Sequence, residues 1–157
     1  MSAVRKESTA MRVPSFSRST AERAATVAAI GFGIVATFQL LLTLGAPWGR
    51  AALGGTNEGT LPPELRAVSS VSMVIFVAAA GVILGRAGFW GDRFSGAFRV
   101  GAWGLVVILP LGALMNLASS SPWERFGWAP FTFGLALATF IVARGRISNE
   151  HTVSVRA

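Results

Sequence analysis

Four long apolar runs alternate with polar connections along this chain of 157 residues. The runs cover residues 24–44, 67–87, 97–118 and 128–143 and are almost free of charged side chains. All but the last reach the ~20 residues that an α-helix needs to cross a hydrocarbon core. They are continuous and rich in Ala, Leu and Gly, whereas the strands of a membrane β-barrel alternate over ~10 positions. The pattern therefore predicts an all-α membrane protein, a bundle of four transmembrane helices.

The connections set the expected domain limits. Residues 1–18 are predicted to be a disordered cytoplasmic tail, residues 19–144 the transmembrane domain and residues 145–157 a second cytoplasmic tail. The stretch from Ser19 to Glu22 is typical of a capping box and predicts the start of the first helix.

Glycine and proline mark most of the remaining boundaries. Gly45 predicts the end of the first helix, and Pro62-Pro63 predicts the start of the second. Pro110 lies within the third run, where it predicts a kink. A second capping box at Ser121 to Glu124 and the nearby Pro130 predict a short interfacial turn before the last span.

Two similar stretches follow the first and third runs, namely Pro47-Trp48-Gly49-Arg50 and Pro122-Trp123-Glu124-Arg125. Each is preceded by an amide side chain, Gln39 or Asn116. This suits two parallel helical-hairpin repeats about an axis along the membrane normal. The alternative is that Pro, Trp and Arg occur independently where helices leave a membrane.

Composition and charge support lipid as the solvent. Hydrophobic residues make up 52% of the chain and charged residues only 13%, against roughly 25% charged in soluble domains. Of 14 Lys and Arg residues, all but Arg50, Arg66 and Arg125 lie before the first run, around the connection between the second and third runs, or after the fourth run. This positive-inside pattern predicts both termini on the cytoplasmic side of the plasma (inner) membrane. The basic residues are scattered, which argues against nucleic acid as a partner.

Several classes of function require residues or motifs that this chain does not contain. The chain has no cysteine, so disulfides, thiol redox chemistry and Cys-ligated metal are excluded. The first run is too long for a signal-peptide core and is interpreted as a retained anchor. A transit peptide is disfavoured by Glu7 and Glu22. No metal-ligand spacing, catalytic triad or phosphate-binding loop is present, so no cofactor is expected, and His151 is expected to be unligated.

Polar residues gather at the external ends of the runs, beside a glycine-rich connection at residues 46–61. Polar groups inside hydrocarbon are costly and often functional. We therefore hypothesise a polar pocket with ligand-binding residues Gln39, Trp48, Arg50, Glu64, Arg66, Asn116, Trp123, Glu124 and Arg125, walled further by Trp128.

Each of these residues also has a structural interpretation. Gln39 and Asn116 are explained by interhelical hydrogen bonds and the tryptophans by an aromatic belt. Glu124 is explained by its cap, and Glu64 and the arginines by ion pairs at the rim.

The order of Gly45-Ala46-Pro47-Trp48-Gly49, Gly54-Gly55, Leu61-Pro62, Arg66, Asn116-Leu117-Ala118-Ser119, Glu124-Arg125 and Pro130 resembles a family of uncharacterised small bacterial four-span integral membrane proteins. The resemblance covers residues 38 to 144. It implies an integral membrane protein whose shared residues lie outside, and it implies no activity. The preference for Arg over Lys fits a bacterial source of high-GC coding.

Three classes of function remain. The favoured class is a non-enzymatic multi-pass membrane protein that binds a lipid, a small molecule or a partner protein at its extracytoplasmic face. The second is a small transporter or channel subunit acting as a homo-oligomer, although none of the seven acids lies inside a span. The third is a membrane enzyme acting on a lipid-like substrate through Glu64, Glu124 and the nearby arginines.

Overall fold

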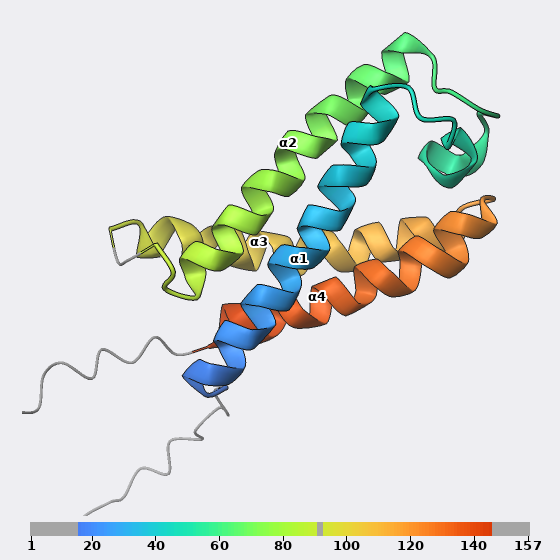
Figure 1. Cartoon of the computed structure of the whole chain (residues 1–157). Helices are drawn as coiled ribbons and strands as arrows, with labels where there is room; N and C mark the ends of the chain where they lie inside the picture. The colour runs from blue at the N-terminus through green and yellow to red at the C-terminus, as the bar shows by residue number, and fades with distance from the viewer. Residues whose placement is uncertain (1–15, 91–92, 146–157) are drawn as a thin grey trace, which may run out of the picture.

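The computed structural model describes residues 16–90 and 93–145, all of which lie in helices and their connections. The long helices are α1 (Arg18–Thr43), α2 (Pro63–Arg86), α3 (Ser95–Ala118) and α4 (Ala129–Arg144) (Figure 1). Two 3₁₀ turns, η1 (Gly49–Ala51) and η2 (Leu53–Gly55), follow α1, and one π-helical turn, η3 (Glu124–Trp128), leads into α4. Four helices are long and apolar enough to cross a membrane, the last when η3 is included. The predicted fold class is confirmed.

The helices form two antiparallel hairpins, α1 with α2 and α3 with α4, which cross each other at an angle (Figure 1). The two described chain ends lie together, because a Cβ on Gly145 would come within 2.6 Å of the Ala21 Cβ. The hairpins separate toward the opposite end, where the connection after α1 lies between them (Figure 1). The expected tails, and His151, fall almost wholly outside the described residues.

Small residues let the hairpins pack closely where they cross. The main core joins all four helices through residues that include Ala28, Phe32, Ile83 and Ala102. Large apolar side chains remain exposed on every helix, as expected where hydrocarbon replaces water. Because lipid is as apolar as these side chains, close packing of small residues contributes most to helix association.

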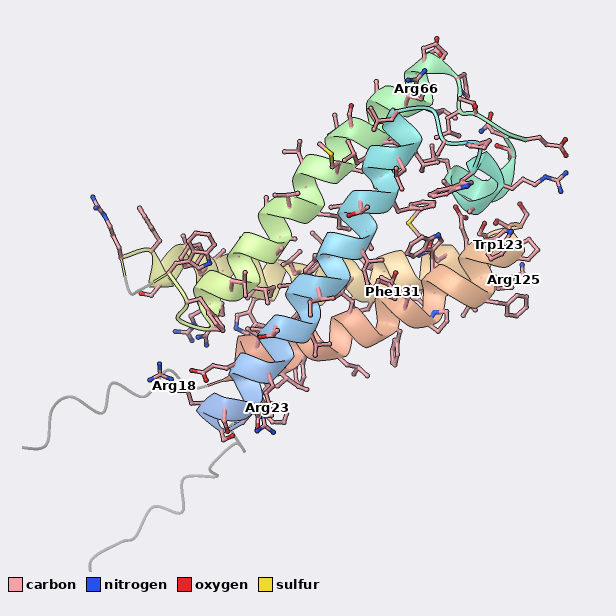
Figure 2. The ribbon with its side chains drawn as sticks, in the orientation of Figure 1. Arg18, Arg23, Arg66, Trp123, Arg125 and Phe131 are labelled. Atoms are coloured by element: carbon pink, nitrogen blue, oxygen red, sulfur yellow. The ribbon has the colours of Figure 1, made fainter. Side chains whose placement is uncertain are left out.

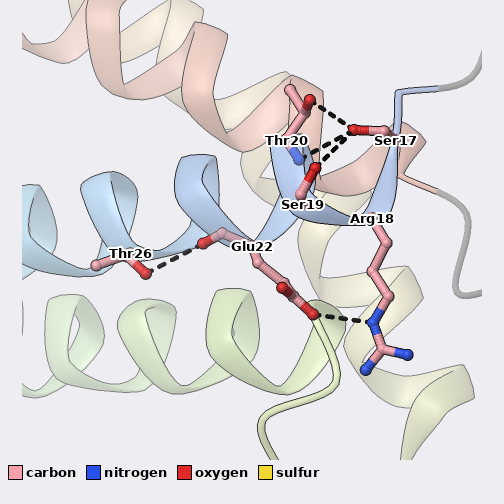
Figure 3. Close-up of polar contacts among 6 residues, drawn as sticks. All are labelled: Ser17, Arg18, Ser19, Thr20, Glu22 and Thr26. Carbon is pink, nitrogen blue, oxygen red and sulfur yellow. Dashed lines mark hydrogen bonds and ion pairs between the residues drawn. The ribbon is translucent and has the colours of Figure 1, made fainter.

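The start of α1 differs from the prediction. Ser17, not Ser19, is the N-cap, and its Oγ accepts from the Thr20 N–H at 3.2 Å (Figure 3). Glu22 accepts from Arg18 Nε at 2.9 Å, one helical turn earlier. The predicted capping box is therefore wrong: an acid at this position serves equally well in an i,i+4 ion pair.

Other helix ends follow the sequence. Gly45 and Gly88 end α1 and α2 with φ values of 98° and 93°. Beyond each helix the amides bond back over the last turn, for example from Phe89 N–H to the Leu84 carbonyl at 3.1 Å, which is the Schellman arrangement. Pro63 is the first residue of α2. The helix α3 runs through Pro110 from Ser95 to Ala118.

Gly81 and Gly85 lie one turn apart on α2, and only Gly85 lies at a close contact. A Cβ on Gly85 would lie 2.6 Å from the ring of Phe98 on α3, whereas a Cβ on Gly81 would have no atom within 4 Å. Gly101 on α3 gives a second close approach between these helices, since its Cβ would lie 2.9 Å from Val82 Cγ1 on α2.

We predict that Gly85→Ala makes the protein about 1–3 kcal/mol less stable than Gly81→Ala, because only the first forces a neighbouring ring to move. Both substitutions raise helix propensity equally, so their difference isolates the packing effect. Unfolding in SDS titrations followed by circular dichroism measures it. Equal midpoints would show that Phe98 moves aside without cost.

Candidate functional site

The connection between α1 and α2 is a folded segment, which we call the outer loop (residues 46–61). Its two ends are tied together by a hydrogen bond from Gly49 N–H to the Gly59 carbonyl at 2.8 Å. A side chain at Gly49 would meet that same oxygen at 2.8 Å, so glycine is required there. Ala52 and Leu61 are buried with Leu42 of α1. The outer loop therefore has a small core of its own.

The outer loop docks on the turn that joins α3 to α4. Three side chains of that turn donate hydrogen bonds to loop carbonyls, which satisfies backbone groups that would otherwise be unpaired at the contact. The bonds run from Ser120 Oγ to Gly54 O (3.0 Å), from Ser121 Oγ to Arg50 O (2.6 Å) and from Trp128 Nε1 to Ala51 O (3.0 Å).

Glu124 supplies a fourth contact in the opposite sense. Its carboxylate is buried and accepts from Gly54 N–H at 3.0 Å. Gly54 lies among three consecutive residues with positive φ, between Leu53 at 52° and Gly55 at 68°. The predicted capping box is thus only half formed: Ser121 Oγ accepts from the Glu124 N–H at 3.4 Å, but the Glu124 side chain binds the outer loop.

The chain from Pro122 to α4 is one continuous helix containing the π turn η3, so the predicted separate interfacial turn is wrong. In η3 the Ala129 N–H bonds to the Glu124 carbonyl, five residues earlier. Pro130 has no N–H to give to the preceding turn. A widened turn accommodates this loss without ending the helix, and such turns often occur at functional sites.

A pocket of about 570 Å³ lies between α1, the outer loop and the η3–α4 segment. We call it the outer pocket. Its lining is almost wholly apolar and contains five aromatic residues and one charged residue. The lining residues are Ile34, Phe38, Pro47, Trp48, Arg50, Ala51, Trp123, Gly127, Trp128 and Phe131.

The aromatic walls are ordered by contacts among themselves. Phe38 stacks on Trp48 with ring centroids 6.0 Å apart and planes 8° apart. It also meets Trp128 at 4.8 Å, and Trp128 meets Phe131 edge to face at 5.7 Å. Such pairs contribute about 0.5–1.5 kcal/mol each beyond their buried area. The walls are therefore fixed by contacts within the protein.

Three of the nine predicted site residues line the outer pocket, namely Trp48, Arg50 and Trp123, and Trp128 lines it as expected. The other six do not. The predicted polar pocket is therefore replaced by an aromatic one.

Two of the remaining arginines bind the ends of helices. Arg66 Nε donates to the Thr43 carbonyl at 2.8 Å, at the end of α1. Arg125 donates to the carbonyls of Leu117 and Ser119, at 3.2 and 2.8 Å, at the end of α3. Figure 2 shows both arginines at the outer-loop end, whereas Arg18 and Arg23 lie at the other. Cations are favoured at helix C-termini, so both have structural roles.

The amides and Glu64 also lie away from the outer pocket. Asn116 Nδ2 donates to Thr132 Oγ1 on α4 at 3.4 Å, which is the interhelical interpretation. Gln39 is half-buried on α1, and Glu64 is exposed in the first turn of α2. The arginines of the two similar stretches, 47–50 and 122–125, therefore have different roles. Arg50 pairs with Glu58, whereas Arg125 binds the end of a helix.

Sequence reasoning missed Ile34, Phe38, Gly127 and Phe131. Their spacing carried a signal, because Phe38 and Ile34 lie one turn apart on α1, as do Gly127 and Phe131 along η3 and α4. In an apolar run, however, such spacing is indistinguishable from lipid-facing or core positions.

Within residues 16–90 and 93–145, no three His, Asp or Glu side chains gather in a way that could hold a metal ion. The chain matches no family model, no curated protein and no solved structure. The resemblance to small bacterial four-span proteins therefore stays a prediction. The fold and the pocket together define a four-helix membrane protein with an aromatic pocket beneath a docked loop.

We predict that Gly55→Ala opens the outer loop. Its Cβ would lie 2.6 Å from the Ser121 Cβ and 2.9 Å from the Arg50 carbonyl oxygen, at a positive φ. The control is Gly59→Ala, which also has positive φ but open space around the Cβ. Trypsin should cut after Arg50 several-fold faster in Gly55→Ala than in Gly59→Ala, because an undocked loop is accessible. Fragment masses identify the cut, and equal rates would contradict docking at Ser121.

Proposed function

We propose that this protein is a non-enzymatic membrane protein that binds a lipid-like molecule in the outer pocket, at the extracytoplasmic face of a bacterial inner membrane. The observation that carries the proposal is the aromatic lining of a pocket of about 570 Å³. That size lies within the 300–1,000 Å³ typical of ligand sites.

The position of the outer pocket supports a ligand from the bilayer. Ile34 lies nine residues before the end of α1, a depth of about 13 Å at 1.5 Å per residue. Pro47 and Arg50 belong to the outer loop, at the level of the helix ends. A molecule that fills the pocket is therefore polar at one end and apolar along its body.

Neither alternative class gains support from the geometry. Neither Glu64 nor Glu124 lines the outer pocket, as an acid pair acting on a ligand there would require. Glu124 is bound to the outer loop. Among the described residues, the side-chain hydrogen bonds between different elements lie at the outer-loop end, apart from those of Arg86. This distribution disfavours a polar path across the membrane.

A brominated probe tests the proposal, because bromine quenches tryptophan fluorescence on contact. Trp90 and Trp103 lie outside the outer pocket, and replacing both with Phe leaves only its three tryptophans. In nanodiscs of unbrominated phosphatidylcholine, a dibromostearoyl amphiphile should quench this variant saturably. Partitioning into the bilayer alone would give quenching that grows without saturation.

The matched variants are Gly127→Leu and Gly134→Leu. Neither glycine has an atom within 4 Å of its ideal Cβ, but only Gly127 lines the outer pocket. Gly127→Leu should abolish saturable quenching and Gly134→Leu should preserve it. Saturable quenching that survives in both variants would place the probe elsewhere and overturn the proposal.

The orientation has its own test. The chain has no cysteine, so Asn57→Cys in the outer loop provides a single thiol. It should react with a membrane-impermeant maleimide on intact bacterial cells, because the basic connections hold the other end at the cytoplasm. Ser95→Cys, at the start of α3, should react only after permeabilisation. The reverse pattern would invert the topology.

A further inference from the structure

Arg50 is the only charged residue that lines the outer pocket. Its side chain is 67% exposed and forms an ion pair with Glu58, whose side chain is 76% exposed. Exposed ion pairs contribute little, at most about 1 kcal/mol. Glu58 is therefore a partner that a ligand anion can replace.

The other polar side-chain groups of the lining are the indole N–H groups of Trp48, Trp123 and Trp128. Indole and guanidinium groups are donors only. The Trp128 N–H already donates to the Ala51 carbonyl, and the Arg50 carbonyl already accepts from Ser121 Oγ. The side chains of the outer pocket therefore offer hydrogen-bond donors and positive charge to the polar end of a ligand.

An aromatic lining of this kind also suits a quaternary ammonium group, which is attracted to ring faces. Here, however, the positively charged guanidinium of Arg50 also lines the pocket, and it would repel a cationic ligand. The charge of the lining thus distinguishes between two ligands that its shape would accept equally.

We propose that Arg50 determines the specificity of the outer pocket and selects a single-chain amphiphile with an anionic headgroup, a carboxylate or a phosphate. The apolar chain lies along Ile34, Phe38 and Phe131, and the headgroup replaces Glu58 beside the guanidinium. Arginine binds either oxyanion with paired N–H donors. This inference rests on the proposed function, since it names the headgroup of the same ligand.

The experiment compares headgroups on one brominated chain in the nanodiscs described above. The probes are dibromostearate, dibromostearoyl lysophosphatidic acid, the neutral dibromostearoyl methyl ester and a dibromostearyl trimethylammonium salt. At least one anion should bind about threefold to fivefold more tightly than the ester, the size expected of an exposed ion pair. The ammonium probe should bind most weakly. The tighter of the two anions distinguishes a free fatty acid from a phospholipid headgroup.

Three variants test the role of Arg50. Arg50→Gln should remove the preference for anions and leave ester binding unchanged, and Arg50→Lys should restore part of it. Glu58→Gln should tighten anion binding, because the competing carboxylate is gone. Native purification followed by lipid mass spectrometry should recover an anionic single-chain species from wild type and less from Arg50→Gln.

The possible failures are distinguishable. Saturable binding of all four probes with equal affinity, or equal loss of every probe in Arg50→Gln, would overturn the role of Arg50 while leaving the outer pocket as a lipid site. Tightest binding of the ammonium probe would establish an aromatic cage for cations instead. Absence of saturable quenching with every probe would overturn the proposed function itself.

Discussion

The docking of the outer loop on the turn between α3 and α4 is the constraint on which the outer end of the molecule depends. A loop beside hydrocarbon must find partners for its backbone groups, because lipid offers none. Here Ser120, Ser121 and Trp128 bind its carbonyls, and Glu124 binds an amide. The same contacts hold Trp48 and Arg50 on the side of the outer pocket that faces α4. Without them, the outer pocket would lose one wall.

The arginines follow a second rule of the fold. Arg66 and Arg125 bind carbonyls at the ends of α1 and α3, and Arg86 binds the Ala143 and Gly145 carbonyls at the end of α4, at 3.1 and 2.8 Å. Each guanidinium satisfies carbonyls that a helix leaves unpaired and lies at the negative end of its dipole. These charges serve the fold. Arg50 differs because its partner is an exposed side chain.

The fold could be predicted from the sequence because each span is encoded locally. Run length defines a transmembrane helix, and Gly45 and Pro63 mark boundaries through their own φ preferences. The start of α1 could not be predicted with the same precision, since Ser17 and Ser19 are both competent caps. Only packing and the Arg18–Glu22 pair distinguish the two registers.

The site was less predictable because its contacts are distant in the sequence. Glu124 meets Gly54 across 70 residues, and that contact involves a segment in which Leu53, a residue rarely left-handed, has φ 52°. Nothing in the local sequence around Glu124 distinguishes this partner from its own helix cap. The polar residues were correctly placed at one end, but most of them satisfy the backbone. The pocket is lined by aromatic residues, of which Trp48, Trp123 and Trp128 were predicted, whereas Phe38 and Phe131 were concealed by the apolar pattern.

The origin of the outer pocket also bears on what fills it. At the crossing, Gly31 approaches Leu135 so closely that an added Cβ would lie 3.0 Å from its side chain. Toward the outer end the docked loop separates the hairpins, and Phe38 and Phe131 do not fill the space between them. Side chains that border a space without partner atoms lose dispersion contacts on that side. Since Ile34 is 49% exposed and Trp123 67% exposed, the outer pocket is open to its surroundings, and in a bilayer those surroundings are acyl chains. If the proposed function holds, a ligand in the outer pocket would supply packing contacts that the separated hairpins lack at the outer end.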